Sequence, residues 1–247
     1  MLNNREGNMS DAANLNQNTA SGGKIVVDLF YLPPIEFFVA IDGVEEIVIE
    51  KHDNYQKQSY RNRTAIQLAN QVKHLSIPVA GGNKKRKYVE VEMDDSQCWR
   101  NVHLRGIQSA YGKAPFFEYF FSDFEAIYLK DHTTLYSFNL DLLTLCLRCL
   151  RHTAKLVETS SYEAISEEID LRGVIKAKQS YEYRNIYKPF PYAQIFGLNF
   201  APNLSILDLL FCSGPNSKDV IDRSKKELNN NTKDCVFKTN SVTLVNN

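Results

Sequence analysis

The chain has 247 residues, of which 43% are hydrophobic and 23% are charged, a composition typical of a globular protein with one domain. Its 29 Lys and Arg residues balance 29 Asp and Glu residues, whereas a nucleic-acid-binding protein normally carries a basic face. No apolar run approaches the roughly 18–20 residues needed to cross a bilayer, and residues 1–23 lack the apolar core of a signal peptide. We therefore expect a cytoplasmic protein with a disordered leader over 1–23, no membrane span and no nucleic-acid partner.

Residues 24–93 contain the short β-branched or alternating apolar runs that are typical of strands. One helix is expected at 35–41, after two prolines, because proline in the first helical turn has no helical hydrogen bond to lose. Asn70-Gln71 separates two apolar runs and favours a hairpin. The expected strands are 24–30, 46–50, 65–69, 72–79 and 88–93.

From residue 94 onward the pattern is mainly helical. Trp99, His103, Ile107 and Tyr111 recur at intervals of four, with Val102 among the apolar residues between them, and predict one buried helix stripe. Further helices are expected at 116–129, from about 137 to 150 and at 204–211, with a strand at 154–158, a polar connection over 159–187 and a frayed polar tail over 218–247. This order predicts an α/β domain over 24–217, with a mixed sheet and a flanking helical layer.

Five scattered cysteines argue against a disulfide framework. Cys146 and Cys149 form a C-x-x-C pair inside a leucine-rich helical run, where this spacing places two small apolar side chains on one face. No second cysteine pair or histidine pair completes a zinc set. We therefore predict no metal site and no cofactor.

Residues 31–38 (YLPPIEFF) lie at the carboxyl end of the first predicted strand, the edge at which open α/β sheets bind ligands. Glu36 falls in the first turn of the helix that follows. Its carboxylate is a candidate for catalytic proton transfer, and it equally suits the helix dipole without any catalytic role. Both interpretations stay open from the sequence.

Residues 57–63 (KQSYRNR) form a second polar cluster before a strand. Arg61 and Arg63 point the same way in an extended chain, with Asn62 on the opposite side. Two guanidinium groups would hold a phosphate or carboxylate bidentately, and the alternative is a solvated segment. The chain contains no Walker A, G-x-G-x-x-G, H-E-x-x-H or G-x-S-x-G motif.

His103 is the third candidate, on the same predicted stripe as Trp99 and Tyr111. An imidazole is the side chain best suited to proton transfer near neutral pH. A single histidine on an apolar stripe also fits a hydrogen-bonded core residue. The sequence leaves both roles possible.

Several blocks in the same order resemble the WbqC-like protein family, in the shorter form found in Bacteroides-like bacteria. The resemblance runs from about residue 24 to 217. In longer relatives a Gly-Gly…Tyr segment precedes the closing block, where this chain has residues 167–178 instead. The blocks are 31–38 (YLPPIEFF), 57–63 (KQSYRNR) with 75–79 (LSIPV), 99–103 (WRNVH) with 111–117 (YGKAPFF), 192–196 (YAQIF) and 203–215 (NLSILDLLFCSGP).

The resemblance implies a role in surface-polysaccharide (O-antigen-type) biosynthesis. We hypothesise transfer of an acyl or aminoacyl group to the amine of a nucleotide-linked sugar. The alternative is a non-catalytic sugar-nucleotide-binding or assembly protein. From residue type and position, Arg61 and Arg63 would hold the diphosphate, His103 or Glu36 would take the proton, and Tyr192, Gln194 and Asp208 would line the sugar. Asn62 and Tyr111 are further candidate ligand-binding residues.

Overall fold

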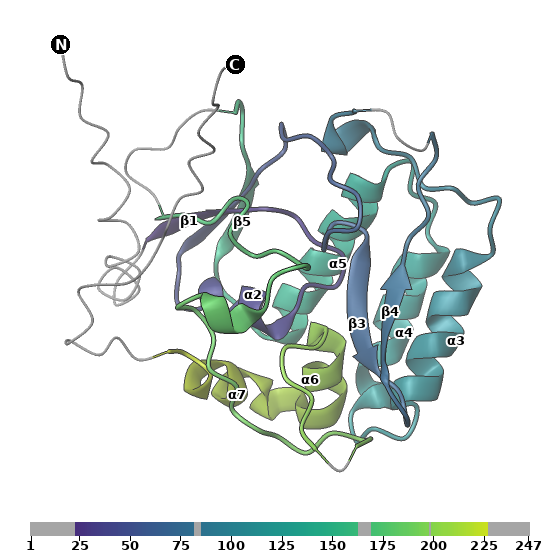
Figure 1. Cartoon of the computed structure of the whole chain (residues 1–247), viewed down its shortest axis with the longest axis vertical. Helices are drawn as coiled ribbons and strands as arrows, with labels where there is room; N and C mark the ends of the chain where they lie inside the picture. The colour runs from purple at the N-terminus through teal and green to yellow at the C-terminus, as the bar shows by residue number, and fades with distance from the viewer. Residues whose placement is uncertain (1–22, 82–84, 163–168, 198, 227–247) are drawn as a thin grey trace, which may run out of the picture.

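The computed structural model describes residues 23–81, 85–162, 169–197 and 199–226. Four strands form one parallel sheet in the order β5-β2-β1-β6 (Figure 1). The chain leaves β1 toward β2 on one side and later pairs β6 with the other side of β1, so the sheet has a topological switch between β1 and β6. The strands are β1 (Lys24–Val27), β2 (Glu46–Ile49), β5 (Lys155–Glu158) and β6 (Ile169–Asp170).

Helix α2 (Ile35–Ala40) connects β1 to β2 and is buried along its whole length. Pro34 occupies the N-cap position with an extended backbone, and Gly43, at φ 86°, lies in the turn that follows the helix. A positive φ costs glycine no steric strain, which suits this reversal toward β2. The predicted strand–helix–strand unit at 24–50 is therefore confirmed, with β1 shorter than expected.

The start of helix α6 (Ile206–Ser213) lies beside the start of α2. The amide of Ile35 donates to the carbonyl of Leu204 (3.0 Å), and the amide of Ile206 donates to the carbonyl of Pro33 (2.9 Å). These reciprocal bonds join two segments that are about 170 residues apart in the sequence. Each helix carries one buried carboxylate in its first turn, Glu36 in α2 and Asp208 in α6.

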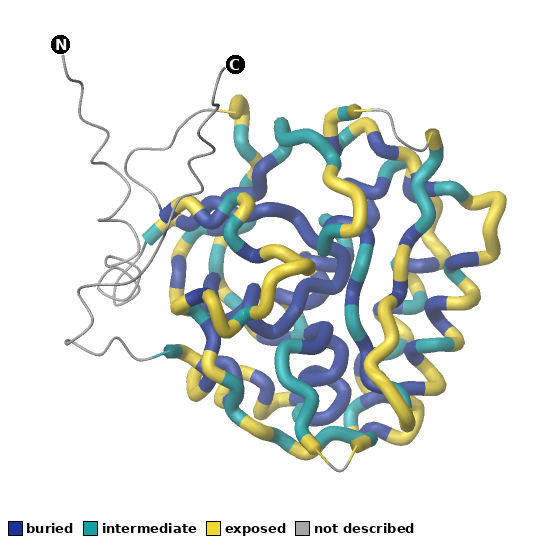
Figure 2. Tube along the Cα trace, in the orientation of Figure 1, coloured by how far each residue is buried: buried dark blue, intermediate teal, exposed yellow. Residues whose placement is uncertain are grey.

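Strands β3 (Arg63–Gln67) and β4 (Val72–Ser76) form the predicted hairpin, which stands apart from the parallel sheet (Figure 1). The two strands pair antiparallel, and the amide of Leu68 donates to the carbonyl of Gln71 (2.9 Å) in the turn. Because strand side chains alternate, Arg63, Ala65 and Gln67 share the face opposite the fully buried Ile66. Most of β4 is exposed (Figure 2).

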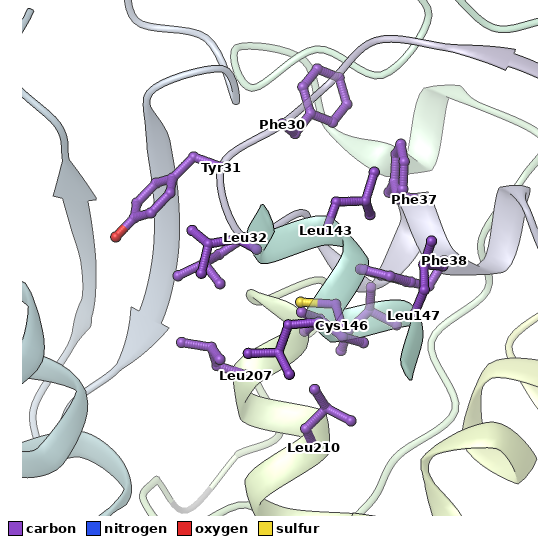
Figure 3. Packing of buried hydrophobic residues seen from close by; sticks show 14 of the residues in the cluster. Phe30, Tyr31, Leu32, Phe37, Phe38, Leu143, Cys146, Leu147, Leu207 and Leu210 are labelled. Carbon is purple, nitrogen blue, oxygen red and sulfur yellow. The ribbon is translucent and has the colours of Figure 1, made fainter. Parts of the chain in front are cut away.

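The helical layer is built from amphipathic helices that bury one apolar face each. Figure 3 shows Leu143, Cys146 and Leu147 of α5 beside Leu207 and Leu210 of α6. Cys146 is completely buried among them, as the core interpretation of the C-x-x-C pair predicted. The helices are α3 (Trp99–Tyr111), α4 (Phe117–Leu129), α5 (Leu135–Cys149), α6 and α7 (Ser217–Arg223).

The predicted fold class is confirmed, because a parallel sheet, an antiparallel pair and a helical layer coexist. Residues 88–93 do not form the strand predicted from their alternation. Tyr88–Glu90 is instead a single 3₁₀ turn. The Tyr88 side chain is buried in the core, and the Tyr88 amide donates to the carbonyl of Asp53 (2.9 Å). Val102 is 56% exposed, so it lies outside the buried stripe of α3.

Two short elements had no counterpart in the predictions. The polar connection contains β6, which is only two residues long and therefore too short to show a period. The polar tail begins with α7, whose Val220 and Ile221 are buried, so residues 217–223 are ordered rather than frayed. Residues 1–22 of the leader predicted over 1–23, and the part of the predicted tail beyond 226, lie outside the described residues.

Candidate ligand-binding face of strand β3

The first residue of β3, Arg63, has an unengaged guanidinium group. Its Nε atom is buried and has no hydrogen-bond partner, and among the described residues no carboxylate forms an ion pair with it. The hydroxyl of Tyr55 is likewise buried and unpaired. Burial raises the pKa of Tyr55 to about 12, and the charges of Arg61 and Arg63 act against this rise, which places the hydroxyl near both arginines. Arg63 and Tyr55 thus offer hydrogen-bond donors at one end of β3.

The other end of β3 lies beside a cluster around Asp208, whose side chain is completely buried. Its Oδ2 atom accepts hydrogen bonds from the Tyr192 hydroxyl (2.5 Å) and from Gln194 Nε2 (2.9 Å). The hydroxyl of Tyr111 interacts with the same carboxylate and also accepts from the amide of Gln67 (3.3 Å). The sequence grouped Tyr111, Tyr192, Gln194 and Asp208 as one candidate set, and the fold brings them together.

Two buried acceptors in this cluster remain unsatisfied. Asp208 Oδ1 has no hydrogen-bond partner of good geometry, and Gln67 Oε1 has none either. Burial raises the pKa of Asp208, whereas the hydrogen bonds from Tyr192, Gln194 and Tyr111 lower it. Since a buried acceptor without a partner costs about 1–3 kcal/mol, these two atoms mark a position at which a ligand donor would be stabilising.

The two ends differ in polarity. Arg63 and Gln67 lie four residues apart on the same face of β3, which corresponds to roughly 13 Å along a strand. At the Arg63 end, Arg63 Nε and the Tyr55 hydroxyl are unpaired donors and Asn62 Oδ1 is an unpaired acceptor, whereas Gln67 Oε1 and Asp208 Oδ1 at the other end are both acceptors. The unpaired donors at the Arg63 end therefore suit an anionic group, and the unpaired acceptors at the Asp208 end suit an amine or hydroxyl.

Arg61 is engaged elsewhere. Its guanidinium binds Asp28 (Nη2 to Oδ1, 2.9 Å), Asp53 and the carbonyl of Asn54, and the side chain is buried. Asn62 is also used structurally, since its Nδ2 donates to the carbonyl of Ile77 (3.0 Å). The predicted pair of phosphate-binding arginines is thus divided, because only Arg63 keeps its donors unengaged.

At the carboxyl edge of the parallel sheet, the carboxylates are also bound by groups of the protein itself. Asp28, which follows β1, accepts from Arg61 and from the amide of Gly173 (2.7 Å), across the topological switch. Glu50, which follows β2, is buried and accepts from Arg172 (2.6 Å). These carboxylates have protein partners, and neither is among the unsatisfied buried groups of the described residues.

His103 lies inside an aromatic cage rather than in a cleft. Its Nδ1 atom is 2.8 Å from the Tyr31 hydroxyl, which also contacts the Tyr128 hydroxyl, and its ring lies 5.2 Å from that of Trp99. In Figure 3 the Tyr31 hydroxyl points away from the aliphatic core residues. Burial lowers the pKa of His103 to about 4, although a hydrogen bond to the backbone of Ser76 opposes this. His103 is therefore neutral at pH 7.

Glu36 forms a buried ion pair with Arg184. Arg184 Nε donates to Oε1 and Nη2 donates to Oε2, both at 2.6 Å, and both side chains are almost completely buried. Asn203 Nδ2 donates to the same Oε2 (3.3 Å). The carboxylate is thus fully engaged by the chain itself. Glu36 and Asp208 both act electrostatically on Tyr187, so the two carboxylates are neighbours around that ring.

The sequence interpretation missed several residues of this region. Gln67 could have been predicted from the sequence, because side chains alternate along a strand and therefore place Gln67 on the same face as Arg63. Tyr55 and Arg184 had none, since each comes from a polar segment without a period. Among the described residues, no group of three or more His, Cys, Asp or Glu side chains is arranged to hold a metal ion. Within those same residues, every helix is too short or too polar to cross a bilayer.

The fold and the surroundings of β3 define an α/β protein with an unengaged arginine at one end of this strand and a buried carboxylate near the other. The sequence model of the WbqC-like protein family matches residues 30–189, and the chain belongs to this family. The chain is also similar to Rv1507c of Mycobacterium tuberculosis, which is named as an uncharacterized protein, with 24% identity over 222 residues, 79% of this chain and 96% of that protein. No solved structure matches the chain significantly.

Proposed function

We propose that this protein is a cytoplasmic group transferase of surface-polysaccharide biosynthesis, which binds a nucleotide-linked amino sugar along β3 and transfers an acyl or aminoacyl group to the sugar amine. The polysaccharide context comes from the family resemblance. The observation that carries the proposal is the polarity of the unpaired buried atoms, with donors on Arg63 and Tyr55 and acceptors on Gln67 and Asp208.

The Arg63 end suits the phosphates of the ligand. An arginine offers a planar fork of donors that matches phosphate geometry, and a neighbouring phenol adds one more donor. Residues 61–63 were expected to act together here. With Arg61 bound to Asp28 and Asp53, the proposal assigns the phosphate contact to Arg63 alone.

The Asp208 end suits an amino sugar. Gln194 and Tyr192 hold one carboxylate oxygen, so Asp208 Oδ1 faces the ligand as an acceptor. Half-buried aromatic rings lie nearby, because the Tyr192 and Phe200 ring centroids are 5.2 Å apart. Aromatic faces cover apolar ligand surface at low entropic cost, as in many small-molecule sites.

In the proposed reaction the sugar amine attacks the carbonyl carbon of an activated acyl or aminoacyl donor, such as a thioester. A C–N bond forms, the bond from the carbonyl carbon to the leaving group breaks, and Asp208 takes one amine proton and passes it to the leaving group. A carboxylate whose pKa is raised by burial is a stronger base than one in water. The proposal gives this role to Asp208, because its Oδ1 atom is unpaired, whereas both oxygens of Glu36 and the Nδ1 atom of His103 have protein partners.

The test is calorimetric titration with UDP-glucosamine. Arg63→Ala should weaken binding by about 10- to 100-fold, the loss expected for a charged hydrogen bond of about 1.5–3 kcal/mol. Arg148→Ala, which changes an exposed arginine on α5, is the matched control and should bind like the wild type. Equal affinity of all three proteins, or no binding by any of them, would overturn the proposal.

Catalysis is tested separately from binding. Wild-type protein is incubated with UDP-glucosamine and a panel of acyl and aminoacyl thioesters, and the sugar product is followed by mass spectrometry. Asp208→Asn should retain binding and lose turnover by about 10²–10⁴-fold. Binding without turnover for any donor would favour the alternative, a sugar-nucleotide-binding or assembly protein.

A further inference from the structure

The segment that carries Tyr192 and Gln194 to Asp208 has no helix or strand of its own. We call residues 188–197 and 199–203 the strap, and the structure describes them as irregular backbone between η2 (Tyr181–Tyr183) and α6. Within the strap, Gln194 Nε2 donates to the carbonyl of Ala201 (2.9 Å), and the amide of Ala201 donates to Gln194 Oε1 (2.8 Å). These two bonds fix the strap against itself. At its start, the amides of Lys188 and Phe190 also donate to Ser224, at 2.8 and 3.3 Å.

Both ends of the strap are bound by one carboxylate. Arg184, just before the strap, and Asn203, at its end, donate to the same oxygen of Glu36, Oε2, at 2.6 and 3.3 Å. The amide of Glu36 returns a bond to Asn203 Oδ1 (2.9 Å), and the amide of Asn203 donates to the Tyr187 hydroxyl (3.3 Å). Asn203 has φ 54°, a left-handed conformation that asparagine tolerates better than most residues.

We infer that Glu36 is a positioning residue, which closes the strap at its base and thereby places Tyr192 and Gln194 on Asp208. A buried ion pair adds little net stability compared with an apolar pair of similar size, but it fixes one geometry. Glu36 and Arg184 are 0% and 4% exposed, so no water competes for their contacts. This role deepens the proposed function, on which its ligand-binding consequence rests.

The test compares two double variants in the full chain. Glu36→Gln/Arg184→Gln removes both charges of the clamp without leaving either one unpaired. Glu50→Gln/Arg172→Gln removes another buried arginine–carboxylate pair, at the edge of the parallel sheet, and is the matched control. Hydrogen exchange followed by mass spectrometry should show at least tenfold faster exchange in strap peptides of the clamp variant, with no such change in the control.

The second readout is the pH dependence of UDP-glucosamine binding. Tyr192 and Gln194 lower the pKa of Asp208 by hydrogen bonding, so a loosened strap should move the pH midpoint of binding upward in the clamp variant only. A general loss of stability would not move this midpoint. Strap exchange equal to wild type in the clamp variant would overturn the inference. If wild-type protein did not bind UDP-glucosamine, the proposed function would fail while the exchange experiment still tested the clamp.

Discussion

His103 provides a pH-dependent term in the stability of this protein that follows directly from its surroundings. The ring lies between the Tyr31 hydroxyl and the backbone of Ser76, and the pKa falls from 6.5 to about 4. The backbone carbonyl can only accept, so Nε2 carries the proton and Nδ1 accepts from Tyr31. Protonation would remove the acceptor and place a charge beside Trp99 and Tyr128 without a carboxylate partner.

The sign of the effect is set by the lowered pKa in the folded state. The stabilising contribution is complete above pH 6.5 and is lost as the pH falls toward 4, because the unfolded chain binds the proton first. For folded and unfolded pKa values of about 4 and 6.5, the loss between pH 7 and pH 5 is about 2 kcal/mol.

The assay is urea unfolding at pH 7, 6 and 5, followed by fluorescence of Trp99, which is the only tryptophan and whose ring lies 5.2 Å from that of His103. His103→Gln keeps a polar side chain that does not titrate, so it removes only the contribution of His103 to the pH dependence of the free energy of unfolding. Wild type should lose about 2 kcal/mol more than the variant between pH 7 and pH 5. Other titrating groups, such as Asp208 and His152, contribute equally to both proteins. Parallel pH dependence in the two proteins would refute the buried, neutral state of His103.

Three further outcomes are expected. Arg61→Ala should lower the free energy of unfolding by about 3–5 kcal/mol in urea titrations, because buried Asp28 loses its counter-charge. The control Arg148→Ala, at an exposed ion pair, should change it by less than 1 kcal/mol. Equal effects of the two variants would contradict the burial of the Arg61–Asp28 pair. Gly214→Ala should lower the melting temperature more than Gly173→Ala. Both glycines have positive φ, but only at Gly214 would the new Cβ meet the Phe116 ring, at 2.4 Å. A similar decrease in both variants would show that the contact with Phe116 has no effect on stability. Asp208→Asn should remove the part of the pH dependence of UDP-glucosamine binding that comes from Asp208 and leave only that of the sugar amine, and a pH profile identical to wild type would remove Asp208 from the site.

The sequence by itself was enough for the regular elements with a clear period. The hairpin at β3 and β4, the stripe of α3 and the strand–helix–strand unit around α2 follow from local side-chain patterns, because one face of each element is apolar. It was also enough for the family, which the match over residues 30–189 shows. Residues 88–93 show the limit of this reasoning, because burial of Tyr88 turns 88–90 into a 3₁₀ turn and leaves only isolated bridges at residues 92 and 93.

The state of each polar side chain was decided only by the tertiary structure. Arg61 and Arg63 are alike in the sequence, yet one meets Asp28, a residue 33 positions earlier, and the other meets no carboxylate among the described residues. Glu36 likewise receives its partner from Arg184, 148 residues away. Hydrogen bonding and desolvation depend on atoms that surround a group in space, and local sequence carries no record of contacts at such separations. The sequence therefore determined which residues were candidates, and the fold determined which of them kept an unpaired atom for a ligand.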